Sequence, residues 1–169
     1  MPGSLESGRI TLQGELYGNP CIITLTFRAV HDFFQPQPVA NADVFLLYTV
    51  LHDWSDKYAA KILRYLRNAA MPSTQLLIVD NLMSYACADD SNQGIFGVEI
   101  QLPPSPLLAN YGYAGAISYY EDMAMLAIHN GKERTITELA SLLDITGWKM
   151  IQVVQGGHMS SHKVIAIPV

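Results

Sequence analysis

Two runs of apolar residues on either side of an amphipathic segment constrain the fold of this chain more than any other feature. The runs are residues 43–50 (DVFLLYTV) and 74–79 (TQLLIV), and strands that are apolar throughout are typical of sheets covered on both faces. Between them, apolar residues recur at helical spacing from Ala59 to Ala70, after Ser55 as a candidate N-cap. This order of strand, helix and strand predicts a right-handed βαβ unit in a parallel sheet.

Shorter patterns surround this unit. Residues 8–13 alternate between apolar and polar like a strand, and residues 21–27 (CIITLTF) form a second β-rich run. Residues 81–117 show no period and contain three prolines that would break a helix. At the C-terminus, residues 148–154 and 163–169 predict a pair of strands joined by a Gly-Gly loop. The fold class that we expect is therefore α/β.

Two helices are expected between the long loop and the last strands. Ser118 and Thr135 each begin an S/T-x-x-E pattern ahead of helical sequence, which is the signature of a capping box. Gly131 and Gly147 follow the two periodic segments, and glycine commonly ends a helix because it adopts the left-handed conformation without strain.

Composition excludes several classes of protein. Half of the residues are hydrophobic, which indicates a folded core, and 169 residues suit one domain. With 10 basic and 15 acidic residues the net charge is −5, which argues against a nucleic-acid or anionic-membrane partner. Cys21 and Cys87 have no metal-ligand spacing, and no secretory signal or apolar span of about 20 residues is present. We expect a soluble, cytoplasmic protein that binds no metal.

Polar residues stand at the ends of the apolar strands. His52 and Asp53 follow the first strand, Asp80 follows the second, and Glu133 lies in a turn between the two later helices. In open α/β sheets, ligands bind beyond the carboxyl ends of the strands, so these side chains could meet at one mouth. A His flanked by carboxylates is suited to general-base catalysis.

Simpler interpretations exist for each of these residues. Asp80 could cap the next segment, Glu133 could be a solvated charge paired with Arg134, and His52 could merely begin a helix together with Asp53. The two His-Asp pairs, at 31–32 and 52–53, are also found in metal-dependent phosphohydrolases of the HD type, but that fold is all-helical. The chain contains no G-x-S-x-G, Walker loop or H-E-x-x-H motif. An NAD-linked oxidoreductase would require a G-x-G-x-x-G fingerprint, which is also absent.

Three segments, in this order, resemble the catalytic domain of S-adenosylmethionine-dependent O-methyltransferases of the fungal and plant type, such as the caffeate and flavonoid enzymes. They are residues 31–70, which include HDFF and LHDWSD, 74–81 (TQLLIVDN) and 122–135 (DMAMLAIHNGKERT). The resemblance implies a partial Rossmann-like class I methyltransferase sheet, mostly parallel, with a C-terminal antiparallel strand pair and without the first strands. It also implies S-adenosyl-L-methionine as cofactor and a small phenolic molecule as methyl acceptor.

The resemblance assigns roles to single residues. His52 matches the general base that takes the proton from the acceptor hydroxyl, and Asp80 and Glu133 match the two acids that hold and polarise this histidine. Met125 falls near the residues that line the phenolic ring. The residues that match cofactor-lining positions are Asp32, Phe33, Tyr48 and Trp54.

The sequence departs from the family pattern in four places. The glycine-rich cofactor loop and the following ribose-binding acid do not occur in it. Tyr48 stands where members usually have Lys or Arg. Residues 1–169 correspond to the C-terminal part of the catalytic domain, without the N-terminal domain through which family members dimerise. Residues 15–30 interrupt the match, either as a translated intron, which we favour, or as a real extra strand.

These departures affect the expected function. Because the glycine-rich loop is absent, we expect the isolated chain to bind S-adenosylmethionine poorly and to be impaired as an enzyme. The alternative hypothesis is a non-catalytic remnant that acts as a binding or interaction module. The acceptor and its methylated position are not specified by the sequence.

Overall fold

The structure is a computed structural model that describes residues 9–16, 19–26, 31–87, 103–154 and 161–169. The chain divides into two units, Met1–Gln35 and Pro36–Val169. The first unit contains β1 (Arg9–Leu16) and β2 (Asn19–Thr26), which pair antiparallel as a hairpin. Both of the strands predicted in this region are therefore confirmed. Among the described strands, β2 pairs with β1 alone.

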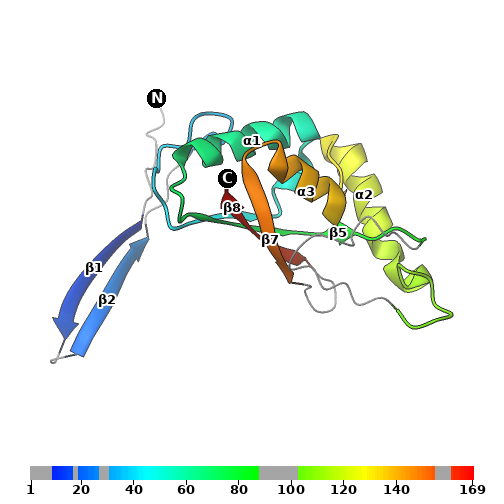
Figure 1. Ribbon diagram of the computed structural model, residues 1–169, viewed down its shortest axis with the longest axis horizontal. Coiled ribbons are helices and arrows are strands. Elements are labelled where there is room, and N and C mark those ends of the chain that lie inside the picture. The colour runs from blue at the N-terminus through cyan, green and yellow to red at the C-terminus, as the bar shows by residue number, and fades with distance from the viewer. Residues whose placement is uncertain (1–8, 17–18, 27–30, 88–102, 155–160) are drawn as a thin grey trace. The chain divides into compact units, whose positions relative to one another are not determined.

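The second unit is built on a mixed sheet of four strands in the order β3-β4-β8-β7 (Figure 1). The strands are β3 (Val44–Tyr48), β4 (Gln75–Asp80), β7 (Trp148–Val154) and β8 (His162–Pro168). The first two pair parallel, and β8 pairs antiparallel with both of its neighbours. The α/β class, the βαβ unit and the C-terminal antiparallel pair are thus confirmed. The Gly-Gly loop predicted between the last two strands lies outside the described residues.

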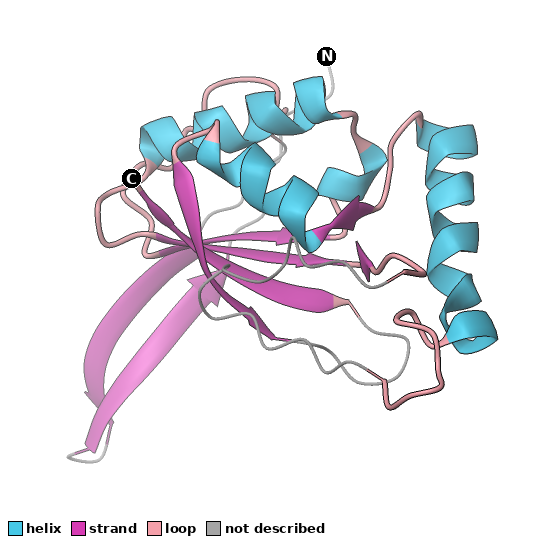
Figure 2. Ribbon diagram, turned by 45° about the vertical axis from the view of Figure 1, so that its right-hand side comes forward, coloured by secondary structure: helices cyan, strands magenta, loops and turns pink. Residues whose placement is uncertain are grey.

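Helices α1 (Asp56–Ala69) and α3 (Ile136–Asp144) lie together over one face of this sheet (Figure 2). The residues of α1 that face the core are Ala59, Ala60, Ile62, Leu63 and Leu66. The buried indole of Trp148 donates a hydrogen bond of 3.0 Å to the Leu63 carbonyl, which joins α1 to β7. None of the helices in the described part of the chain is long and apolar enough to cross a membrane.

Shorter elements complete the second unit. Helix α2 (Ala116–His129) follows a 3₁₀ turn, η3 (Gly112–Gly115), within the region expected to be irregular. Strands β5 (Leu82–Met83) and β6 (Arg134–Thr135) form a parallel pair of two residues each. This pair connects the end of β4 to the turn between α2 and α3.

Burial of β3 differs from the sequence prediction. Its residues alternate, with Phe45 and Leu47 buried while Val44, Leu46 and Tyr48 are 52%, 58% and 62% exposed. The expectation that this strand is buried on both faces is therefore wrong. The reason is that helices α1 and α3 cover only one face of the sheet, so every second residue of β3 points away from them. Strand β4, which lies between β3 and β8, is buried along most of its length.

The two predicted capping boxes have different outcomes. Thr135 caps α3, where its hydroxyl accepts from the Glu138 N–H and the Glu138 carboxylate accepts from the Thr135 N–H. The prediction at Ser118 is wrong, because α2 begins two residues earlier and follows directly on η3. Ser118 thus lies within the first turn of an existing helix and has no free helix end to cap.

This difference predicts the effects of two matched substitutions on stability. Thr135→Ala removes a hydroxyl that satisfies an otherwise unpaired helix N–H, and it should lower the free energy of unfolding by about 1 kcal/mol. Ser118→Ala, at the position that the sequence pattern marks equally strongly, should change it by less than about 0.5 kcal/mol. Urea unfolding followed by circular dichroism measures both. Equal losses in the two variants would contradict the assignment of Thr135 as the cap.

Candidate active site

The backbone at the end of β3 turns sharply and places His52 over the carboxyl end of the sheet. Thr49 adopts a φ of 49°, a left-handed conformation that is uncommon and costly for a β-branched residue. Its N–H donates to the Val79 carbonyl of β4 at 2.8 Å. The 3₁₀ turn η1 (Leu51–Asp53) follows directly and carries His52.

Glu133 reaches His52 from the turn between α2 and α3. His52 Nδ1 lies 2.9 Å from Glu133 Oε1, and the Glu133 side chain is almost fully buried. The Glu133 backbone N–H donates to Asp122 Oδ1 of α2 at 2.8 Å, which holds the turn in place. Because an ionised carboxylate only accepts hydrogen bonds, this contact assigns the ring hydrogen to Nδ1. Nε2 of the neutral imidazole is then the basic atom.

Asp80, the last residue of β4, lies on the inner side of the same site and is 6% exposed. Burial raises the pKa of its carboxyl to about 7, even though His52, Arg134 and the Leu51 N–H lower it. Two carboxylate oxygens, Asp80 Oδ1 and Glu133 Oε2, are buried and have no hydrogen-bond partner among the described residues. Asp80 therefore acts on His52 through its charge, and its hydrogen bond goes to the backbone that carries the histidine.

A small cavity of about 10 Å³ lies between these groups, close to the smallest volume that holds one water. Its lining residues are His52, Asp80, Asn81, Leu82, Lys132, Glu133, Arg134 and Leu139. This cavity on the inner side of the imidazole is too small for an organic molecule.

A third carboxylate, that of Asp53, lies on the outer side of His52. Nε2 lies 3.6 Å from Asp53 Oδ1, and His129 Nε2 lies 3.7 Å from the same oxygen. The hydrogen bond with Glu133 is the main cause that raises the pKa of His52. Burial opposes it, and the charges of Asp80, Glu133 and Asp53 add to it. The arrangement thus favours an imidazole that accepts a proton near neutral pH.

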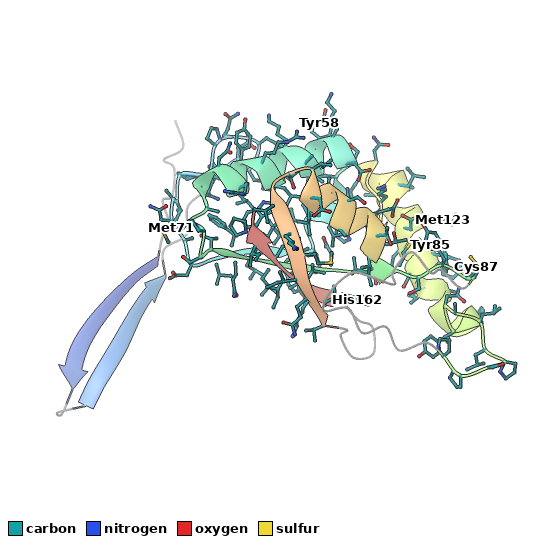
Figure 3. The ribbon with its side chains drawn as sticks, viewed as in Figure 1. Tyr58, Met71, Tyr85, Cys87, Met123 and His162 are labelled. Atoms are coloured by element: carbon teal, nitrogen blue, oxygen red, sulfur yellow. The ribbon has the colours of Figure 1, made fainter. Side chains whose placement is uncertain are left out.

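His162 flanks the acidic side of the site from the neighbouring strand. In the antiparallel register of β4 and β8, His162 stands opposite Asp80, and Figure 3 shows it near the start of β8. Its Nδ1 accepts the Leu82 N–H at 3.2 Å, and burial lowers its pKa. His162 is therefore suited to remain neutral and to support the chain after β4.

The structure brings together His52, Asp80 and Glu133, as the sequence predicted, and excludes the simpler interpretation of Glu133. Glu133 is buried against the imidazole, whereas Arg134 forms its ion pair with Asp56 at 2.9 Å. Within the described ranges, no three His, Cys, Asp or Glu side chains are arranged to hold a metal ion.

The residues that the sequence assigned to the cofactor and acceptor are distributed over both units. Tyr48 is largely exposed at the carboxyl end of β3, and the half-buried Trp54 lies 6.1 Å from the ring of Tyr58. Met125 is half-buried on α2, and its carbonyl accepts the Gly131 N–H at 3.2 Å. Two further cofactor positions belong to the first unit, Asp32 and Phe33.

The described residues fit one part of a cofactor site. Tyr48 and Trp54 provide aromatic surface beside the catalytic candidates, at the end of the sheet where ligands bind in α/β proteins. Asp32 Oδ1 accepts the Phe34 N–H at 2.9 Å, which orders the HDFF segment locally. The sequence contains no glycine-rich turn that would supply backbone N–H groups.

Comparison with known proteins identifies the family. The model of the O-methyltransferase domain matches residues 24–149. The chain belongs to the O-methyltransferase family. It is 41% identical over 174 residues to 4-O-methyltransferase 1 of Phanerochaete chrysosporium, covering 99% of this chain and 33% of the relative. It is 37% identical over 176 residues to an O-methyltransferase of Armillaria gallica, covering 100% of this chain and 34% of the relative.

Solved structures agree with this O-methyltransferase assignment. The structure of mitomycin 7-O-methyltransferase superimposes with a TM-score of 0.62 and 27% identity, covering 82% of this chain and 33% of that chain. The chain therefore spans about a third of the length of these three O-methyltransferases.

Several residues of the site were not predicted from the sequence. Arg134, Asp122 and Thr49 were not assigned to the site, although the structure shows each of them supporting the base or its turn. The signal for Arg134 was its position within GKERT, beside the predicted acid. The left-handed conformation of Thr49 has no signal in its residue type, because threonine rarely adopts it.

Proposed function

We propose that this chain contributes the general base and part of the ligand site of an enzyme that methylates a hydroxyl group of a small phenolic molecule. The observation that carries the proposal is the 2.9 Å contact between His52 Nδ1 and the buried Glu133 carboxylate. This contact directs Nε2, the basic atom, away from the acidic interior. The names of the relatives, a 4-O- and a 7-O-methyltransferase, support a hydroxyl as the acceptor.

The protein groups act on the acceptor as follows. Nε2 of His52 takes the proton of the hydroxyl, and the imidazolium that forms is stabilised by Glu133 on one side and Asp53 on the other. The buried charge of Asp80 stabilises the same cation. When bound, S-adenosylmethionine would supply an electrophilic methyl carbon, and the sulfur would leave as a neutral thioether when its bond to that carbon breaks.

Binding of the two ligands would use different parts of the chain. We propose that Tyr48 and Trp54 of the second unit line the cofactor. The cofactor-lining roles that the family resemblance implies for Asp32 and Phe33, which belong to the first unit, stay predictions. Half-buried Met125 on α2 would contact the acceptor ring. Holding the two reacting atoms in contact would supply much of the rate enhancement, because a positioned pair no longer has to meet by diffusion.

The proposal predicts a change in the pH dependence of methyl transfer in Glu133→Gln. His52 must be deprotonated to act, so the rate should rise as pH passes through its pKa. Glu133 is the main group that raises this pKa, so its neutral amide should shift the rising limb to lower pH. The plateau rate should also fall, because the imidazolium loses its partner. Rates of methyl transfer from labelled S-adenosylmethionine between pH 5 and 9 would measure both effects.

The test needs a complete enzyme and a control. A chimera in which this chain replaces the corresponding third of the Phanerochaete 4-O-methyltransferase provides the other two thirds of such an enzyme. Glu121→Gln is the matched control, because Glu121 is an exposed acid of α2 that binds Asn81. A rising limb at the same pH in Glu133→Gln and the parent would contradict His52 as the base.

A further inference from the structure

The turn that carries His52 is held by hydrogen bonds from the segment that follows α2. The guanidinium of Arg134 donates to the Leu51 carbonyl and to the Trp54 carbonyl, each at 2.8 Å. The Lys132 N–H donates to the His52 carbonyl between them, at 2.9 Å. Three hydrogen bonds, to the carbonyls of residues 51, 52 and 54, thus fix this turn against the segment from which Glu133 reaches the imidazole.

The ion pair between Arg134 and Asp56 does not explain why Arg134 is buried. Its side chain is 4% exposed, whereas its acidic partner Asp56 is 57% exposed. Removing a cation from water is costly, and an acid at the surface compensates only in part. The two carbonyls explain the position of Arg134, because a planar guanidinium can reach several acceptors in fixed directions while a lysine ammonium cannot.

Gly131 shows how closely the two segments approach. A Cβ atom at this position would overlap the His52 carbonyl oxygen and approach the Asp53 backbone. No side chain fits between this backbone and the turn. The segment 131–134 therefore contacts the turn by its backbone at one end and by Arg134 at the other.

We propose that Arg134 is a positioning residue, which orients the imidazole of His52 toward Glu133 by holding both ends of the turn that carries it. This inference rests on the proposed function, in which His52 is the base. The side chain of Arg134 is 4% exposed, and it contacts the Asp56 carboxylate and the two turn carbonyls rather than the imidazole. Its substitution should move His52 away from its hydrogen-bond partner and leave the rest of the fold intact.

The direct test is nuclear magnetic resonance of the ¹⁵N-histidine-labelled 169-residue chain, which reports both the pKa and the tautomer of His52. In Arg134→Lys, the pKa of His52 should fall toward its ordinary value of about 6.5, and the preference for the Nδ1–H tautomer should be lost. The charge is kept in this variant. A purely electrostatic role for Arg134 would therefore leave the pKa unchanged, and in Arg134→Gln it would raise it.

Arg67 provides a matched control for loss of stability. It also donates two hydrogen bonds to backbone carbonyls, those of Gly147 and Val169, each at 2.9 Å. Arg67→Lys should lower the melting temperature but leave the pKa and tautomer of His52 unchanged. Asp56→Asn removes the ion pair and keeps the carbonyl contacts, so it should move the His52 signals less than Arg134→Lys.

The outcomes separate the alternatives. Unchanged His52 signals in folded Arg134→Lys would overturn the proposal, and so would unfolding of Arg134→Lys while Arg67→Lys stays folded, because Arg134 would then be a general determinant of stability. Gly131→Ala should disturb the same His52 signals by displacing the turn directly. These measurements do not depend on methyl transfer, so failure of His52 as a base would be recognised separately by unchanged turnover in His52→Ala.

Discussion

Replacing His52 by Ala in the complete chimera should lower the rate of methyl transfer by about 10²–10⁴-fold, the range typical of a positioned general base. A phenol with a pKa of about 10 is mostly protonated at neutral pH, so without the base the reaction would depend on the small ionised fraction. The affinity for the cofactor should change little, because the imidazole faces the acidic pocket and the outer side of the site. Initial rates with saturating cofactor, together with calorimetric cofactor binding, measure the two quantities.

His129 is the matched control for this substitution. It lies on the same side of the site, 3.7 Å from Asp53 Oδ1, but it is more exposed than His52 and contacts no buried acid in the described structure. His129→Ala should retain most of the activity. The rate of His52→Ala should also recover at alkaline pH, where the acceptor ionises without help. A variant that keeps parental turnover at pH 7 would remove His52 from the mechanism.

The second large effect concerns stability and involves Asp80. Its pKa is about 7 in the folded protein and about 3.9 in an unfolded chain. Between these values the folded state binds more protons, so this group's contribution is fully present below about pH 4 and is lost as pH rises through 7. Between pH 5 and 8 the loss should amount to roughly 2–3 kcal/mol, because each pKa unit corresponds to about 1.4 kcal/mol.

Asp80→Asn should abolish this loss. The amide has the same shape and never ionises, so the variant should be more stable than the parent at pH 8 and much closer to it at pH 5. Urea unfolding at the two pH values measures the difference. Asp144→Asn, which changes an exposed acid at the end of α3, should follow the parent at both. Parallel pH dependences for Asp80→Asn and the parent would show that Asp80 is not held at a raised pKa.

A buried acid that lowers stability at neutral pH is itself informative about function. Asp80 is nearly enclosed, and one of its oxygens has no partner among the described residues. Residues with strongly shifted pKa values are commonly found at functional sites. Unpaired or strained groups at such sites are often kept although they lower the stability of the fold. A stabilised Asp80→Asn protein with reduced methyl transfer would fit this pattern.

The order of the elements and the identity of the central residues could be predicted from the sequence. The helical period of α1 predicts which of its faces is buried, because a helix that covers a sheet needs one apolar face. The apolar run of β4 predicts a strand inside the sheet. His52 and Asp80 follow strands that turned out to be parallel neighbours. Their convergence is therefore a consequence of topology. Glu133 was predicted to reach the same mouth from the turn between the two later helices, and the family resemblance gave it a role.

Contacts between distant segments could not be predicted, since they depend on which neighbours the fold supplies. The apolar run of β3 resembled that of a strand covered on both faces, but the described helices cover one face, so Val44, Leu46 and Tyr48 are exposed. Likewise, Ser118 matches the capping pattern as well as Thr135 does, and only the preceding turn η3 removes the free helix end.

The sequence by itself determined the α/β alternation, the βαβ unit and the candidate base with its two acids, because periodicity and chain order act over short distances. The tertiary structure decided how these groups work together. It placed Glu133 on Nδ1, enclosed Asp80 so that its pKa rises to about 7, and set Arg134 behind the turn of His52. Hydrogen bonds and desolvation depend on distances of a few ångströms between segments about 80 residues apart, and only the folded chain fixes those distances.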